Sequence, residues 1–167
     1  MARKSRRTEF PRQVPSEYLR LALETREPSF NRRREITTAL HAVSRELGWR
    51  VQEFFWNKIA KSYHWAHVQH EERQFAVLFE QGSRVTALAG RVAEYPDRGF
   101  FDDPAFCEAA ATVGDGQFVV APAQELTSEL TEADRALIDA HPDVIWPDDM
   151  KYWKPRSVGE VLFNFWD

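Results

Sequence analysis

The sequence predicts an α+β fold: N-terminal helices, a central antiparallel β-meander of three to four strands, and C-terminal helices packed on the sheet. Three patterns predict it: a helical apolar period over 31–47, three β-type runs between residues 63 and 95, and helix-capping sequences after residue 102. The chain has 167 residues, of which 43% are apolar and 13% aromatic, enough for one core. We therefore expect a single domain over 15–167, preceded by a basic mobile arm at 1–14 that has no apolar period.

Two helices are expected before the sheet. Ser16 is placed to cap the first, which continues to about Arg26 and ends before Pro28. The second runs from about Asn31 and is followed by Gly48, the residue type that most often closes a helix in the left-handed conformation. The apolar residues of the second helix are spaced four, three and four apart along one face: Ile36, Leu40, Val43 and Leu47.

The next segment, 49–61, fits two structures. Val51, Phe55 and Ile59 have the four-residue spacing of a helix face. The β-branched and aromatic residues of the segment also suit a strand. We favour a helix that ends near Ala60.

Three β-type runs follow, at 63–69, 74–80 and 84–95, and a short fourth strand is expected at 117–120. Polar turns of a few residues join the first three, which is typical of an antiparallel meander. The middle run is apolar at successive positions, as expected of a central strand covered on both sides.

The geometry of a strand predicts which side chains of this middle run share a face. Phe75, Val77 and Phe79 are expected on one side of the strand, with Ala76 and Leu78 on the other, because successive side chains point to opposite faces. All five are expected to be buried.

Helices are expected again after the meander. A loop from Asp97 leads to Asp103, which precedes a proline and is placed to cap a helix over 104–111. Thr131 and Ser157 are each followed three residues later by a carboxylate, the spacing of a capping box, and each is expected to begin a helix.

Charge is distributed unevenly along the chain, whose formal net charge is −4. Residues 1–34 hold ten Lys and Arg against four Glu, whereas residues 35–167 carry a net charge of −10. The densest acidic stretch, 94–149, has fourteen acids against two arginines. An acidic surface of this kind either only keeps the protein in solution or steers a basic partner to it.

Composition argues against several classes of protein. The one cysteine, Cys107, excludes an internal disulfide framework, and its alanine-rich surroundings predict a buried structural thiol. The alternative is a nucleophile whose pKa is lowered near the start of a helix. No apolar run can span a bilayer and no leader segment opens the chain, so we expect a cytoplasmic protein without membrane contact. No stretch matches a catalytic or cofactor motif, so no catalytic residue and no cofactor is assigned.

His64, His67 and His70 are the residue types that bind zinc or iron. In a strand, His64 and His70 would share one face but lie about 20 Å apart at ~3.3 Å per residue, and His67 would face the other way. One ion cannot reach both ends, so we expect no metal site. The carboxylate pairs Asp102–Asp103 and Asp148–Asp149 lack the order of an EF-hand and are expected only to be solvated.

We favour a non-enzymatic interaction protein of the inhibitor or immunity kind, which presents an acidic surface to a basic protein partner such as a nuclease or toxin. The expected partner-binding residues are four acids and two tryptophans: Asp102, Asp103, Asp148, Asp149, Trp146 and Trp153. We expect no nucleic-acid partner except through the arm at 1–14, because the acidic remainder repels phosphate.

The alternative is a small enzyme in which His64 or His70 forms an acid/base pair with Glu71 or Glu72. A histidine beside a carboxylate is a workable base, but the sequence shows neither a nucleophile nor an oxyanion donor to accompany it. Whether the chain is an enzyme therefore stays open, with a non-enzymatic role favoured.

Overall fold

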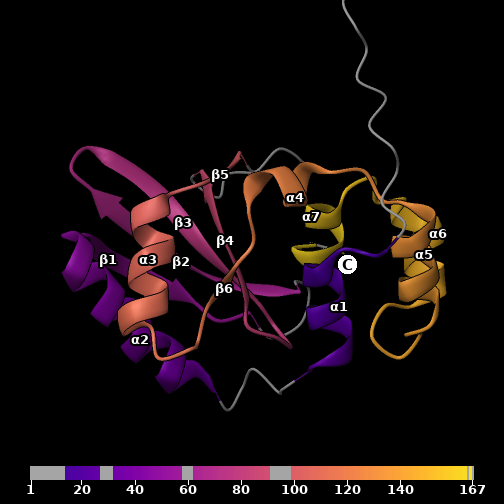
Figure 1. The fold of residues 1–167 in the computed structure, drawn as a ribbon, viewed down its shortest axis with the longest axis horizontal. Helices are drawn as coiled ribbons and strands as arrows, with labels where there is room; N and C mark the ends of the chain where they lie inside the picture. The colour runs from indigo at the N-terminus through magenta and orange to yellow at the C-terminus, as the bar shows by residue number, and fades with distance from the viewer. Residues whose placement is uncertain (1–13, 27–31, 58–61, 91–98, 165, 167) are drawn as a thin grey trace, which may run out of the picture.

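A computed structural model describes residues 14–26, 32–57, 62–90, 99–164 and 166, and the fold is α+β as predicted (Figure 1). The strands are β1 (Arg50–Phe55), β2 (Tyr63–His70), β3 (Arg73–Glu80), β4 (Val85–Gly90), β5 (Phe100–Phe101) and β6 (Val119–Val120). The helices are α1 (Glu17–Glu24), α2 (Arg33–Leu47), α3 (Pro104–Val113), α4 (Ala123–Thr127), α5 (Glu132–Asp139), α6 (Pro147–Trp153) and α7 (Val158–Leu162).

The sheet runs in the order β1-β2-β3-β4-β5, and each of these strands is antiparallel to its neighbour. The predicted meander is confirmed over the described residues as β2, β3 and β4, and residues 91–95 of its expected third run lie outside them. β6 pairs with β4 in the parallel direction, so the complete sheet is mixed. His70 pairs with Arg73 at the turn between β2 and β3, where Glu71 has a positive φ of 54°.

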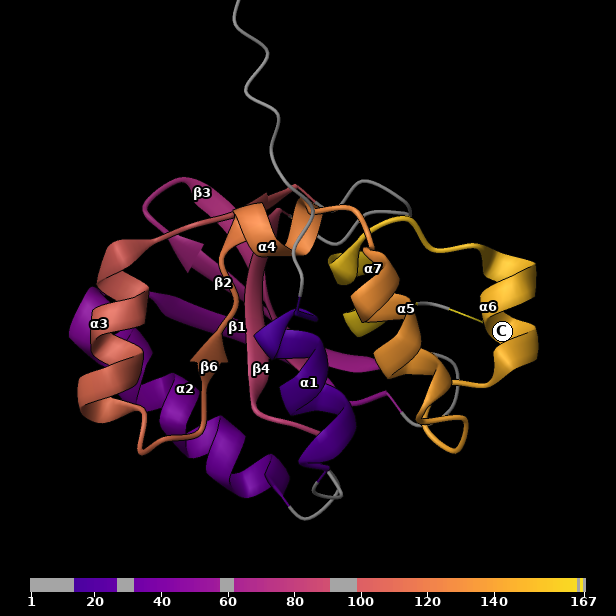
Figure 2. The same cartoon turned by 45° about the vertical axis from the view of Figure 1, so that its right-hand side comes forward.

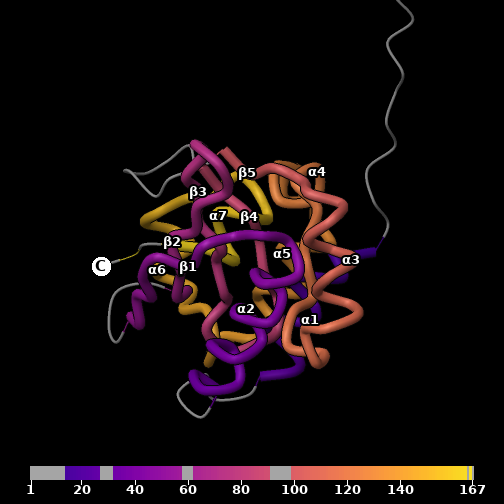
Figure 3. Tube along the Cα trace, turned by 90° about the vertical axis from the view of Figure 1, so that its left-hand side faces the viewer, coloured from indigo at the N-terminus to yellow at the C-terminus, as the bar shows by residue number. Residues whose placement is uncertain are grey.

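Helices cover both faces of the sheet. α2 and α3 pack on one face, which Figure 3 shows from their side, and α1, α4, α5 and α7 lie on the other (Figures 1 and 3). Phe75, Val77 and Phe79 belong to the apolar cluster beneath α2 and α3. Ala76 and Leu78 belong to the cluster on the opposite face. The predicted division of the central strand between two buried faces is therefore confirmed.

The expected helix from Trp49 is wrong where the structure describes it, because residues 50–55 form the edge strand β1. The register with β2 shifts between Val51 and Glu53, which marks a β-bulge. The bulge places Val51 and Phe54 against the same apolar cluster, three residues apart. Phe55 is not in this cluster and stacks on Trp65 instead, so the four-residue spacing of Val51 and Phe55 did not mark one helix face. Residues 58–60 of the expected helix lie outside the described residues.

Most of the predicted helix ends are confirmed. Gly48 closes α2 with φ 69°, and the Asp103 carboxylate accepts the Phe106 N–H at 3.0 Å at the start of α3. Thr131 and Asp134 form a complete capping box at α5. Ser157 accepts the Glu160 N–H at 3.2 Å at the start of α7.

Ser16 precedes α1 as expected, but its side chain does not cap the helix. Its hydroxyl instead points to the Glu125 carboxylate at 3.4 Å, and its N–H donates to Asp134 at 2.7 Å. Three elements were not predicted: the helices α4 and α6, and β5, which lies where a loop was expected after Asp97. These elements are short, so local apolar periodicity gives little sign of them.

The arm predicted at 1–14 lies outside the described residues except for Val14, which is 68% exposed. Cys107 is exposed, and the prediction of a buried thiol is therefore wrong. Among the described residues, no helix combines the length and the apolar character needed to cross a membrane.

Candidate functional site

The residues predicted to bind a partner lie in two separate places. Asp102 and Asp103 precede α3, whereas Trp146, Asp148, Asp149 and Trp153 belong to α6 or its N-terminal end. Figures 1 and 2 show α3 and α6 at opposite ends of the molecule. The two sets therefore do not form one compact cluster.

Asp102 and Asp103 have structural roles at helix N-termini. Asp103 caps α3 through its bond from the Phe106 N–H, and Asp102 accepts the Ala123 N–H at 2.8 Å at the first residue of α4. A carboxylate at such a position satisfies an N–H that the helix leaves unpaired and interacts favourably with the helix dipole. Their negative charge also raises the pKa of nearby Cys107, after the larger effect of burial on that pKa. A lowered pKa for this thiol is therefore wrong.

The acidic stretch 94–149 is only partly a surface feature. Asp134 is fully buried, and it accepts the N–H groups of Ser16 at 2.7 Å and Thr131 at 2.9 Å. Eight other acids of the stretch are exposed: Asp102, Glu108, Asp115, Glu129, Glu132, Asp139, Asp143 and Asp148.

Helix α6 is a protruding element with large exposed side chains. None of its seven residues is buried, Trp146 at its N-cap position is 66% exposed, and Tyr152 is 77% exposed. Asp148 and Tyr152 are four residues apart and so share the exposed side of the helix. Trp153 is half-buried, with its ring 5.0 Å from that of Tyr152. We call Trp146, Asp148, Tyr152 and Trp153 the α6 surface.

The sequence singled out Trp146 and Trp153 but missed Tyr152. The chemical type of a residue does not reveal its exposure, and α6 itself was not foreseen. The proline at 147, followed by two acids, is a helix-start pattern that could have located it.

The three histidines lie on β2 in the arrangement predicted for a strand. His64 is 2% exposed, its Nδ1 accepts the Asn57 N–H at 2.9 Å, and burial followed by the charge of Arg33 lowers its pKa to about 4. The ring centroids of His67 and Phe55 are 4.8 Å apart, whereas His70 is exposed beside Trp49.

His64 is the second residue of β2, and Glu71 and Glu72 form the turn that follows the other end of the strand. The strand therefore separates His64 from both carboxylates by about 20 Å, at ~3.3 Å per residue. His70 adjoins these acids on the exposed turn. Across the described ranges, no three His, Cys, Asp or Glu side chains gather closely enough to hold a metal ion.

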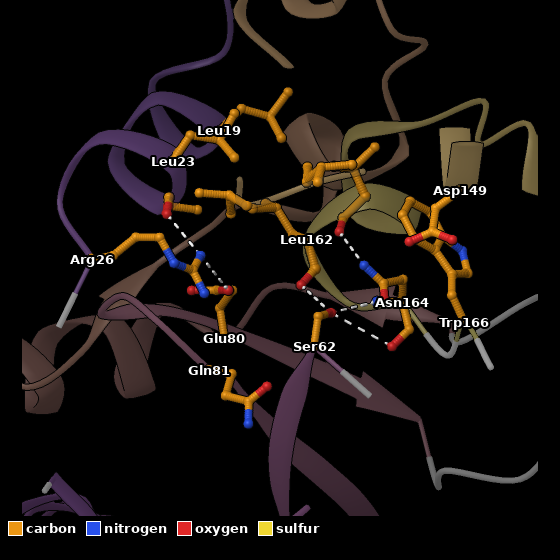
Figure 4. A pocket seen from close by; sticks show the side chains of 14 residues that line it. Leu19, Leu23, Arg26, Ser62, Glu80, Gln81, Asp149, Leu162, Asn164 and Trp166 are labelled. Atoms are coloured by element: carbon orange, nitrogen blue, oxygen red, sulfur yellow. Dashed lines mark hydrogen bonds and ion pairs between the residues drawn. The ribbon is translucent and has the colours of Figure 1, made fainter. Parts of the chain in front are cut away.

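A pocket of about 230 Å³ lies between α1, the end of β3, the segment before α6, and α7 (Figure 4). We call it the Glu80 pocket after the buried carboxylate in its wall. Its polar lining comes from Arg26, Ser62, Glu80, Gln81, Asp149 and Asn164. Its apolar lining includes Leu19, Leu23, Ile145, Val161, Leu162 and the ring of Trp166.

Glu80 is 5% exposed, and each of its carboxylate oxygens has a partner. Oε1 lies 3.4 Å from the Arg26 guanidinium, and Oε2 accepts the Gly82 N–H at 2.9 Å. Burial raises the pKa of Glu80, and Arg26 and the turn hydrogen bonds oppose that shift only in part. From the sequence, Glu80 was expected only as the last residue of a strand. Glu80 directly follows an uninterrupted apolar run, and this position could have indicated that its carboxylate is buried.

Ser62 holds the far wall of the pocket together. Its hydroxyl donates to the Leu162 carbonyl at 2.8 Å and accepts the Asn164 N–H at 2.8 Å, as Figure 4 shows. The side-chain amide of Asn164 donates a hydrogen bond to the Val161 carbonyl at 2.9 Å. These contacts fix the end of α7 against the start of β2.

Comparisons with known proteins assign no relative to this arrangement: no protein-family model matches the chain, and neither the curated proteins nor the solved structures include a match.

Proposed function

We propose that this chain is a non-enzymatic interaction protein of the inhibitor or immunity kind, and that it binds a basic protein partner through the α6 surface. The observation that carries the proposal is the exposure of two large aromatic side chains, Trp146 at 66% and Tyr152 at 77%, on a helix with no buried residue.

Trp and Tyr are the residue types that most often supply the binding energy of protein interfaces. An aromatic side chain buries about 150–250 Å² when it is fully covered. At ~25 cal/mol per Å², covering these two exposed rings would contribute about 3 kcal/mol each, before the costs of association. Asp148, next to Tyr152 on the helix, adds a carboxylate for a Lys or Arg of the partner.

The charge of the chain favours a basic partner over an acidic one. Residues 35–167 carry a net charge of −10, and acids are exposed at many positions beyond α6. Such a field accelerates the encounter with a cationic protein even when its charges lie away from the contact itself. Lys151 and Lys154 near the end of α6 offset the charge of Asp148 and Asp149, so the helix itself is not strongly acidic. We therefore assign the specificity of binding to the aromatic contacts, and the rate of encounter to the acidic residues of the whole surface.

The experiment measures association kinetics on immobilised protein, with the product of the neighbouring gene as candidate and cytochrome c as a generic basic protein. The test variants are Trp146→Ala with Tyr152→Ala, and Asp148→Lys. The matched control is Glu46→Lys on α2, an exposed acid away from α6 whose reversal changes net charge equally.

We expect the aromatic double variant to bind the partner at least about tenfold more weakly, chiefly through a faster off-rate. Asp148→Lys should weaken binding more than Glu46→Lys, and salt should slow the on-rate. Equal binding by all variants would refute the α6 surface. Indifference to salt would refute the electrostatic part, and equal affinity for cytochrome c would indicate attraction without a specific partner.

A further inference from the structure

We propose that the Glu80 pocket binds a primary ammonium group carried on an apolar chain, as in an alkylamine or the side chain of a lysine. The proposal does not depend on the α6 surface, because it concerns a pocket lined by a different set of residues. It is based on the shape of the pocket, the chemistry of its walls and the sign of its charge.

The pocket is amphipathic, and its two kinds of wall come from different elements. Aliphatic side chains of α1 and α7, such as Leu19, Leu23 and Leu162, form one part. Carboxylates of Glu80 and Asp149 lie in other parts of the lining, to either side of Ser62 and Asn164 in Figure 4. A ligand with an apolar stem and one charged head fits such a lining, because lysine-like chains bury their methylenes and present their charge to polar groups.

The sign of the charge follows from the ionisable residues in the wall. Among the residues that the structure describes, the lining contains two carboxylates, Glu80 and Asp149, but one guanidinium, Arg26. The pocket is therefore negative whenever both acids are ionised. Arg26 is 37% exposed and contacts Glu80 through one nitrogen at 3.4 Å, so it does not fully compensate the buried carboxylate.

The remaining acceptors suit a donor-only head group. A carboxylate offers about four acceptor positions. The hydrogen bonds from Arg26, the Gly82 N–H and the Ser83 hydroxyl account for three at Glu80, and Asp149 offers further positions. An ammonium has three donors and no acceptor, and the Trp166 ring, which lies beside Asp149 in Figure 4, adds a face that attracts cations. A carboxylate ligand would meet two like charges, and a neutral alcohol would leave the negative charge uncompensated.

The experiment compares three probes of one length by isothermal titration calorimetry: n-pentylamine, 1-pentanol and pentanoate. A fourth probe, Nα-acetyl-lysine methylamide, carries the same head group on a peptide backbone. We expect pentylamine to bind at least about tenfold more tightly than the alcohol or the acid, the effect of one charge-assisted contact. Binding of the lysine derivative as well would identify a protein lysine as the source, whereas its rejection would identify a free amine.

Two variants locate the site, with an exposed acid as the matched control. Asp149→Asn removes one carboxylate from a helix that has no buried residue, so the fold is retained. Glu80→Gln removes the other. Each should weaken pentylamine binding about tenfold, while Glu46→Gln on α2 should leave it unchanged. Equal binding of amine, alcohol and acid, or amine binding that survives both pocket variants, would overturn the proposal. Absence of amine binding at about 10 mM, roughly tenfold above a Kd of about 1 mM, would do the same.

Discussion

The guanidinium of Arg26 lies across the turn between β3 and β4 and pairs with the buried carboxylate of Glu80, at 3.4 Å between Nη1 and Oε1. A Cβ atom at Gly82 would overlap this guanidinium, so glycine in the turn lets Arg26 approach. The same Arg26 nitrogen donates to the Ala22 carbonyl at 3.1 Å. One side chain thus links α1, the central strand and the wall of the pocket.

Glu80→Gln should change how stability depends on pH. Burial raises the pKa of Glu80 above 4.5, so its contribution to stability is fully present below that value and is lost as pH rises through the folded-state pKa. Relative to the variant, the wild type should therefore become less stable as pH rises above 4.5. Urea unfolding across this range tests it. Parallel curves would show that Arg26 compensates Glu80 completely.

Phe79→Ala should cost about 3–5 kcal/mol of unfolding free energy, because it leaves a cavity in a packed core. Phe79 is 3% exposed and lies 5.6 Å from the ring of Phe118, with His64 as its cross-strand partner on β2. Denaturant titration measures the loss. A cost below about 1 kcal/mol would mean that the core relaxes around the missing ring.

The meander could be predicted from its β-type runs and short polar turns, and the faces of β3 from strand geometry, because successive side chains of a regular strand point to opposite faces. β1 could not, since its bulge breaks the period of two: Val51 and Phe54 share one face, whereas Phe55, whose spacing from Val51 suggested a helix, stacks on Trp65. Ser16 failed as a cap for a different reason. Its hydroxyl is drawn to Glu125, a residue 109 positions away that local sequence does not reveal.

His64→Gln should make the protein less sensitive to acid. The pKa of His64 is lowered to about 4 from 6.5, so the unfolded state takes up the proton first and acid destabilises the wild type between these values. The full effect of a shift of this size is about 3 kcal/mol. The difference in unfolding free energy between wild type and variant should therefore move by that amount from about pH 7 to about pH 4. A constant difference would show that His64 is protonated normally in the fold.

The candidate site was harder to predict than the fold. The Glu80 pocket combines residues from Leu19 to Trp166, and no local pattern signals a cavity formed by segments so distant in sequence. The acidic stretch was visible, but sequence does not separate an exposed acid such as Asp139 from the buried Asp134. That distinction depends on which N–H groups the fold brings within reach.

Asp134→Ala should destabilise the protein by about 3 kcal/mol or more, because it removes two hydrogen bonds to a charged group and leaves two donors unpaired. The affected donors are the N–H groups of Ser16 and Thr131, so the loss falls on the junction of α1 with α5. Asp139→Ala is the matched control, as Asp139 lies in the same helix but is exposed. The control should change stability by no more than about 0.5 kcal/mol. Similar losses in both variants would contradict a structural role for Asp134.

Charge reversal should separate the two groups of predicted partner-binding acids by their effect on folding. Asp103→Lys removes the cap of α3 and places a cation at a helix N-terminus, which should cost about 1–2 kcal/mol. Asp148→Lys makes the same charge change on the exposed side of α6, where only the dipole interaction is affected, about 0.3–1 kcal/mol.

Thermal and denaturant unfolding of both variants measures the difference in stability. Both variants change the net charge equally, so a general decrease in repulsion between acids cannot explain a difference between them. The ordering matters for the proposed function. If Asp103→Lys unfolds more easily, weakened binding in that variant reports lost structure, whereas weakened binding in Asp148→Lys reports a lost contact. Equal stability of the two variants would mean that the Asp103 cap contributes little, and both acids would then serve equally well as probes of a partner.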